Sequence, residues 1–179
     1  MNIRVRRLLR VAAVAVAAGT AAGTMAMPVA SAAPVAASSM SSVGRCTIAH
    51  LRIRLGSASG AAGTEYRNIR FTNTGTRTCA LLGYPGVSFR TAGHQVGFAA
   101  RRSGMSYRSI MISPGGHAVA AYGIPNPGNF PRARCHAARA TAVRIYAPGA
   151  YRSVRLPDRV RLCTTRFGRP VVEPVARRY

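Results

Sequence analysis

The stretch AHLRIRL, residues 49–55, decides the fold class of this chain. Successive side chains of an extended strand point to opposite faces, so the apolar residues Leu51 and Ile53 share one face. Arg52 and Arg54 share the opposite face. This alternation is typical of an antiparallel strand with one buried and one solvated side. No later segment keeps a 3.6-residue apolar period for three turns, which indicates an all-β domain.

Short segments of the same character recur along the chain and are separated by glycine and proline. The further candidate strands are 65–73, 78–82, 86–90, 107–112, 116–124, 140–147 and 170–175, with weaker ones around Val154 and Val160. We expect 107–112 to form a hairpin with 116–124 across Ser113-Pro114-Gly115. About seven to eight strands at this spacing favour an immunoglobulin-like antiparallel β-sandwich.

The segment 1–32 has the three parts of an export signal. Arginines precede an apolar run that is too short for a strong membrane span, and Ala30-Ser31-Ala32 supplies the small residues that a signal peptidase requires. We therefore expect cleavage between Ala32 and Ala33, and a secreted or extracytoplasmic protein without a transmembrane helix in the mature chain. No cysteine adjoins the cleavage site, so no lipid anchor is expected. The pair Arg6-Arg7 leaves general and twin-arginine export both open.

Composition divides the rest of the chain into three parts. Residues 33–44 are alanine, serine and proline, which predicts a flexible leader. Residues 45–176 form the expected single domain, and 177–179 form a basic tail.

All four cysteines fall inside the expected domain, and an even number in an exported chain predicts two disulfides. Three pairings are possible. We favour Cys46 with Cys79 and Cys135 with Cys163, because each bridge then joins neighbours in chain order. The absence of a CxxC pair removes the commonest metal and redox interpretations.

Acidic residues are too few for common hydrolytic chemistry. The chain has 26 basic residues, all arginine, against three acidic ones, and a formal net charge of +23. Glycoside hydrolysis requires two facing carboxylates and calcium requires several oxygen ligands, but only Glu65, Asp158 and Glu173 are available. Asp158 stands beside Arg159 and near Arg161, which predicts a surface ion pair or a turn cap. We expect no catalytic residue, no metal site and no cofactor.

Histidines and tyrosines are the remaining candidates for contacts with a ligand. No two histidines have the spacing of zinc ligands, so we expect four isolated ones, His50, His94, His117 and His136. Tyrosines interleaved with arginine can stack sugars or bases, yet tyrosines on half-buried strands often fill the rim of a core with their hydroxyls in water. We favour the rim position for Tyr66, Tyr84, Tyr107, Tyr122, Tyr146 and Tyr151.

Four segments in a fixed order carry a family resemblance. They are CTIAHLRIRLG, GAAGTEYRNIRFTNTGTRTCALLGYPGVSF, ISPGGHAVAAYG and, before the last cysteine, VRIYAPG. In this order the chain is similar to the secreted actinobacterial domain of unknown function DUF4232. The resemblance implies a small exported β-sandwich, and it carries over no functional residues.

Charge supports the leading functional hypothesis, because net charge governs association with anionic material. We expect an exported, non-enzymatic domain that binds an anionic cell-wall polymer or membrane surface through arginines on the solvent-facing sides of strands: Arg52, Arg54, Arg144, Arg152 and Arg155. The alternatives are a structural or protein-interaction module without specific polyanion binding, and a hydrolase with a site assembled from distant residues. Export argues against intracellular nucleic acid as a partner. The sequence leaves the oligomeric state open.

Overall fold

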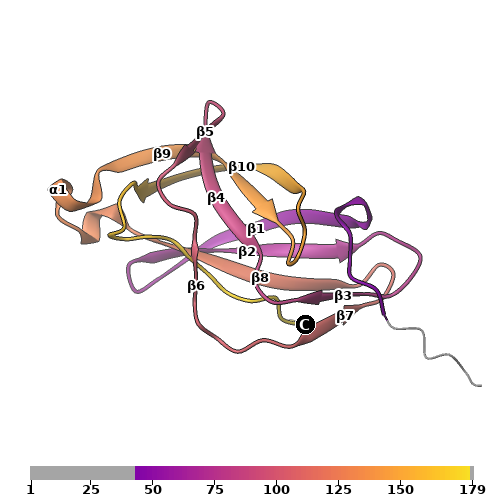
Figure 1. Cartoon of the computed structure of the whole chain (residues 1–179). Helices are drawn as coiled ribbons and strands as arrows, with labels where there is room; N and C mark the ends of the chain where they lie inside the picture. The colour runs from indigo at the N-terminus through magenta and orange to yellow at the C-terminus, as the bar shows by residue number, and fades with distance from the viewer. Residues whose placement is uncertain (1–42, 178–179) are drawn as a thin grey trace, which may run out of the picture. The chain divides into compact units, whose positions relative to one another are not determined.

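The computed structural model describes residues 43–177 (Figure 1). The expected signal peptide 1–32, nearly all of the leader 33–44 and the last two residues of the tail 177–179 lie outside the described residues. Within the described part the chain forms eleven strands, eight of which have four or more residues. The predicted all-β sandwich is confirmed.

Three sheets account for all of these strands. The five-stranded sheet has the order β1 (Leu51–Ala61), β2 (Thr64–Asn73), β8 (His117–Pro125), β11 (Val171–Val172) and β6 (Arg101–Arg102). The four-stranded sheet has the order β10 (Ser153–Cys163), β9 (Ala137–Tyr146), β4 (Gly86–Thr91) and β5 (His94–Val96). The two-stranded sheet pairs β3 (Cys79–Leu82) with β7 (Ser109–Ile112). All pairings between strands are antiparallel except that of β11 with β6.

The helical elements within residues 43–177 are single turns: η1 (Ile48–His50), η2 (Pro127–Asn129) and α1 (Arg132–Cys135). None of them is long and apolar enough to cross a membrane.

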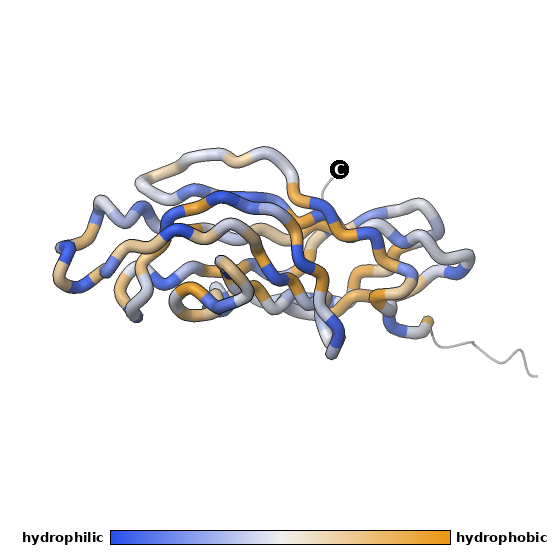
Figure 2. The backbone as a smooth tube through the Cα atoms, turned by 90° about the horizontal axis from the view of Figure 1, so that it is seen from above, coloured by the Kyte–Doolittle hydropathy of each residue, from blue (hydrophilic) through white to orange (hydrophobic). Residues whose placement is uncertain are grey.

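The core lies where the inner faces of the five-stranded and four-stranded sheets meet. Ile69 and Phe71 of β2 and Phe89 of β4 are fully buried. The rings of Phe89 and Tyr122 pack edge to face across the two sheets, with 5.6 Å between their centroids. Hydrophilic and hydrophobic residues alternate along the strands (Figure 2), as a sheet with one buried face requires. Each fully buried side chain of this size contributes about 1.5–3 kcal/mol through removal of apolar surface from water.

The expected hairpin between 107–112 and 116–124 is wrong. Strand β7 pairs with β3, whereas β8 pairs with β2 and β11 in a different sheet. The connecting turn therefore carries the chain from one sheet to another. Asn73 at the end of β2 holds this turn, since its carbonyl accepts from Gly115 N at 2.9 Å and its N–H donates to Gly116 O at 2.9 Å.

The segment Gly83-Tyr84-Pro85-Gly86 also connects strands of two different sheets. It joins β3 of the two-stranded sheet to β4 of the four-stranded sheet. Gly83 has a φ of +96°, a conformation that side chains with a Cβ rarely adopt, so glycine is required there. Its carbonyl accepts from Val175 N at 2.9 Å, which ties the turn to the C-terminal segment.

Two disulfides fasten the ends of the sandwich. Cys46, just before η1, is bonded to Cys79 at the start of β3, and Cys135 at the end of α1 is bonded to Cys163 at the end of β10. This is the pairing that chain order favoured. Each bridge closes a loop across 33 or 28 positions, so each stabilises the fold by about 4 kcal/mol in the chain-entropy account.

The weak candidates around Val154 and Val160 are parts of one strand, β10. Its pairing with β9 shifts between Pro157 and Val160, where β10 has one residue more than its partner. Such a bulge changes which side chains of the strand face the core. A second shift of the same kind lies in β1 between Leu55 and Ala58.

Candidate functional site

The inner face of β2 changes from apolar to polar toward the end of the strand that follows the β1–β2 turn. On β2 the alternate positions run from core to surface as Phe71, Ile69, Arg67 and Glu65. On β9, Val143 and Ile145 are buried, and beyond them Ala140 is buried whereas Arg139 and Thr141 are exposed. Polar side chains of β2, β8 and β10 therefore meet between the sheets beside these apolar residues.

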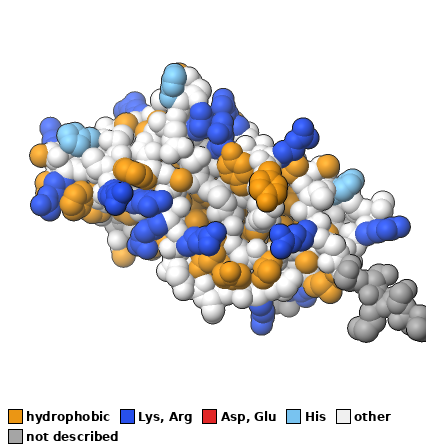
Figure 3. Space-filling view, in the orientation of Figure 1, with side chains coloured by type: hydrophobic (Ala, Val, Ile, Leu, Met, Phe, Trp, Pro, Cys, Tyr) orange, Lys and Arg blue, Asp and Glu red, His pale blue; other side chains and the backbone are white. Residues whose placement is uncertain are grey.

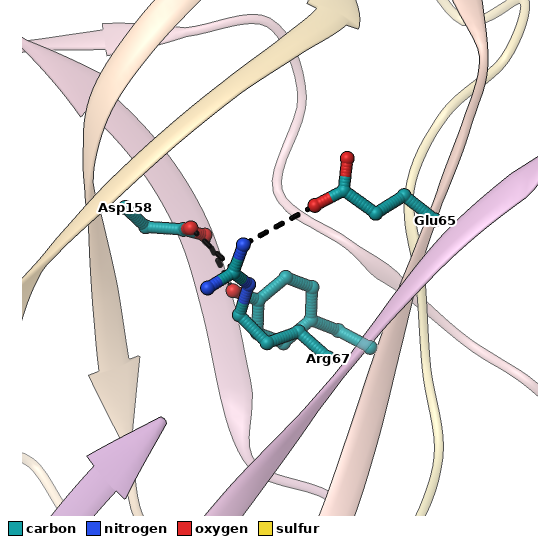
Figure 4. Close-up of polar contacts among 4 residues, drawn as sticks. Glu65, Arg67 and Asp158 are labelled. Atoms are coloured by element: carbon teal, nitrogen blue, oxygen red, sulfur yellow. Dashed lines mark hydrogen bonds and ion pairs between the residues drawn. The ribbon is translucent and has the colours of Figure 1, made fainter. Parts of the chain in front are cut away.

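A buried polar cluster forms the inner part of this region (Figure 4). The Tyr122 hydroxyl donates to Asp158 Oδ2 at 2.5 Å, and Arg67 Nε lies 3.3 Å from Asp158 Oδ1. Arg67 Nη2 lies 3.3 Å from Glu65 Oε1. The Asp158 side chain has no exposed surface, whereas the Glu65 side chain is 46% exposed. The cluster thus runs from the core to the surface through the Arg67 guanidinium.

Local structure explains why these side chains meet. Arg67 lies between Ala58 of β1 and Tyr122 of β8 in the five-stranded sheet. Asp158 lies in the β10 bulge, on the same side of its strand as Leu156 of the core. The bulge therefore places the carboxylate against Arg67 in the opposite sheet.

Burial raises the pKa of the Asp158 carboxyl, while the hydrogen bond from Tyr122 and the charge of Arg67 act in the opposite direction and Glu65 adds to the rise. Burial and the hydrogen bond to Asp158 also raise the pKa of the Tyr122 hydroxyl. Removal of Arg67 would therefore leave the Asp158 carboxylate with the Tyr122 hydrogen bond but without the positive charge that offsets its desolvation.

The expectation of a surface ion pair or turn cap at Asp158 is wrong. Asp158 is 3% exposed and its ion pair within residues 43–177 is with Arg67, whereas Arg159 and Arg161 are exposed. The rim expectation is also wrong for Tyr122, which is 1% exposed with its hydroxyl on Asp158. The sequence holds one signal for Asp158: it lies two positions after Leu156, so both side chains share one face if the strand continues through Pro157.

A cleft of about 1040 Å³ opens at the outer end of the cluster. One wall is the β1–β2 turn with Thr64 and Glu65, together with the end of β8 and Pro127. The other wall comes from β9 and β10, and its long side chains are Arg139, Arg159 and Arg161. The cleft therefore faces solvent between an acidic residue on one sheet and three arginines on the other.

A second basic group lies on the outer face of the four-stranded sheet. Arg144 of β9 stands directly opposite Ser88 of β4 on one side and Arg155 of β10 on the other. Arg90 lies two positions beyond Ser88, and burial together with the charges of Arg144 and Arg155 lowers its pKa. We call Arg90, Arg144 and Arg155 the outer arginine cluster.

The five arginines named from the sequence do not share one face. Arg52 and Arg54 are exposed on β1 of the five-stranded sheet, with Arg54 directly opposite Arg70. Arg144 and Arg155 belong to the outer arginine cluster. The expected strand position of Arg152 is wrong, because this exposed residue lies in the turn between β9 and β10. On the face drawn in Figure 3, arginines lie among hydrophobic side chains and no acidic side chain is visible.

The three acidic residues lie away from the outer arginine cluster. The ion pairs of Glu65 and Asp158 within residues 43–177 both involve Arg67. Glu173 directly follows β11 in the five-stranded sheet. No carboxylate side chain belongs to the strands that carry the outer arginine cluster apart from the inward-facing Asp158.

The other candidate ligand residues are scattered. Within the described residues, no group of three or more histidine, cysteine or acidic side chains is arranged to hold a metal ion. Tyr84 and Tyr107 pack edge to face at 5.6 Å, and the Tyr84 hydroxyl donates to the Met105 carbonyl at 2.5 Å. Tyr151 is 98% exposed in the turn after β9. The tyrosines therefore do not form one stacking surface.

Fold and site together define the class of this protein: a β-sandwich domain with two disulfides, a strongly basic surface and a polar cleft between its sheets. A family model described as Domain of unknown function (DUF4232) matches residues 46–176, and the chain belongs to this family. The resemblance seen in the sequence is confirmed. A search of the curated proteins found no match to this chain.

Proposed function

We propose that this protein is an exported, non-enzymatic domain that binds an anionic polymer of the cell envelope through surface arginines. The outer arginine cluster is the observation that carries the proposal. Like charges on directly paired strand positions destabilise a sheet, and a bound polyanion relieves their repulsion. Guanidinium groups stay protonated and bind phosphate or carboxylate oxygens in pairs, which suits arginine to this role.

The contribution of each arginine is modest, so binding depends on several acting together. Near an anionic surface one arginine contributes about 1 kcal/mol, which is about fivefold in affinity. Binding through three arginines should weaken roughly 40-fold between about 50 and 200 mM salt, if counterion release follows the slope known for nucleic acids. A steep salt dependence without one decisive residue is therefore expected.

Sedimentation of the purified protein with isolated cell walls across a salt series tests the proposal. The double variant Arg144→Gln/Arg155→Gln should bind about 30-fold more weakly at low salt. The matched control Arg52→Gln/Arg54→Gln removes the same charge from the other sheet and should have a smaller effect. Salt-independent binding, no saturable binding, or equal losses in the two variants would contradict the proposal.

A protein-interaction module is the second candidate, and one specific observation favours it. Large hydrophobic side chains are exposed on and beside the two-stranded sheet: Leu82, Met105, Tyr107 and Met111. An exposed apolar group of this kind is typical of contact with another protein. Absence of cell-wall binding, together with self-association of the purified protein that Leu82→Ser/Met111→Ser abolishes, would favour this function over polyanion binding.

A further inference from the structure

We propose that the cleft between the sheets is a binding site for a sugar that carries one phosphate group. This site is separate from the outer arginine cluster, so the inference does not depend on polyanion binding there. It rests on the strand register of β9 and β10 and on the two unlike walls of the cleft.

The basic wall presents two arginines side by side. Arg139 and Arg161 are direct partners in the β9–β10 ladder, and both line the cleft. The Cβ atoms of directly opposed residues are about 5 Å apart, which allows two guanidiniums to bind one tetrahedral anion. Arg159, next to the β10 bulge, lines the same wall. The wall therefore offers more N–H donors than one carboxylate group can accept, which favours phosphate as the bound anion.

The position of these arginines is costly for the fold. Arg139 and Arg161 are exposed and stand directly opposite each other, next to the buried partners Ala140 and Val160. Opposed like charges destabilise a strand pair. The carboxylate that lines the cleft, Glu65, stands on the opposite wall and contacts Arg67. A bound dianion would neutralise the pair Arg139–Arg161, and we infer that this is the role of the arrangement.

The opposite wall suits the uncharged body of a sugar. The Glu65 carboxylate is 46% exposed and can accept hydrogen bonds from sugar hydroxyls. On the arginine wall, Thr141 of β9 also lines the cleft, and a threonine hydroxyl can donate and accept hydrogen bonds. Ile124 and Pro127 supply apolar surface for the C–H face of a sugar ring. Negative charge on Glu65 disfavours a second anionic group at this end. The site thus prefers one phosphate at the arginine wall and hydroxyls at the acidic wall.

The size of the cleft agrees with such a ligand. Small-molecule sites commonly enclose about 300–1000 Å³. The cleft, at about 1040 Å³, admits one or two sugar rings with their bound water.

Titration calorimetry of the purified protein with glucose 6-phosphate, inorganic phosphate and glucose tests the inference. Glucose 6-phosphate should bind saturably and at least about 10-fold more tightly than either fragment, because it engages both walls. Arg139→Gln/Arg161→Gln should weaken this binding by at least about 30-fold. The control Arg144→Gln/Arg155→Gln, also a directly opposed pair of β9 and β10, should change it by less than about twofold.

Several outcomes overturn the inference: no saturable binding of glucose 6-phosphate, equal binding of inorganic phosphate, or equal losses in both double variants. If Arg139→Gln/Arg161→Gln does not fold, amide shift mapping of the unchanged protein decides. Glucose 6-phosphate should then perturb Gly63 and Thr141 in the cleft and leave Ser88 on the outer face unchanged. Cell-wall binding without glucose 6-phosphate binding would refute this inference alone, and the reverse would refute only the proposed function.

Discussion

Replacement of Arg67 by methionine should make the stability of this protein strongly dependent on pH. The methionine keeps most of the packing of the arginine stem but removes the charge 3.3 Å from the fully buried Asp158 carboxylate. Loss of one partner from a buried ion pair costs about 3–5 kcal/mol. For Arg67→Met we expect the free energy of unfolding at pH 8 to fall by about 3 kcal/mol, the lower end of this range. The Arg67 side chain is 22% exposed, so solvent screens part of its charge.

The loss should vanish in acid, because protonation removes the uncompensated charge. Burial already raises the folded-state pKa of Asp158 above its ordinary value of 3.8, so its contribution to stability is fully present below pH 3.8 and is lost as pH rises through the folded pKa. Without Arg67 the folded pKa rises further, and about 3 kcal/mol corresponds to about two pKa units. The decline in the free energy of unfolding should therefore continue to higher pH in Arg67→Met than in the unchanged protein.

Urea unfolding between pH 4 and pH 8 measures this difference. The chain has no tryptophan, so tyrosine fluorescence and circular dichroism report unfolding. Arg70→Met is the matched control, because Arg70 lies on the same strand but is exposed on the outer face. A loss in Arg67→Met that is equal at pH 4 and pH 8, or no larger than that of Arg70→Met at pH 8, would refute the electrostatic reasoning. Asp158→Asn, which cannot ionise, should abolish this part of the pH dependence.

Three further predictions concern the covalent structure and the chemistry of the chain. Removal of the second disulfide by Cys135→Ser/Cys163→Ser should lower the free energy of unfolding by about 4 kcal/mol in urea titrations, and an unchanged midpoint would contradict the loop-closure account. Mass spectrometry of the exported protein should give a mature chain that begins at Ala33, and an intact Met1 would contradict this expectation. Purified protein should not hydrolyse polysaccharide. Hydrolysis that is detected in the unchanged protein and lost in Glu65→Gln would overturn the non-enzymatic proposal.

Alternation and chain order made much of the fold predictable from the sequence. The inward positions Leu51 and Ile53 of β1 follow directly from the spacing of apolar residues. The disulfide pairing followed from the order of the cysteines, since each bridge joins segments close in sequence. These features depend on neighbours along the chain, which a sequence displays.

The cleft and the buried cluster depend on neighbours across strands, which a sequence does not display. Arg139 and Arg161 are 22 positions apart by number, and only the register of the bulged β9–β10 ladder makes them partners. The meeting of Asp158 with Arg67 also requires the two sheets to pack face to face. Pro157 made the strand that contains Asp158 hard to predict, because proline is uncommon inside strands and is usually confined to the edges and bulges of sheets. In this structure Pro157 lies in an edge strand, next to its bulge.

The place of β11 in the five-stranded sheet has a consequence for the order of folding during synthesis. This strand lies between β8 and β6, and the residues after it continue the contact through the bridge of Ala176 with Val119. The strand that joins β6 to the rest of the sheet is therefore synthesised after the other strands of the domain. A growing chain can form the β1–β2 hairpin early, but it cannot complete this sheet until residues 171–176 have emerged. Folding of the whole domain consequently requires its last strand and cannot finish on the β1–β10 segment alone.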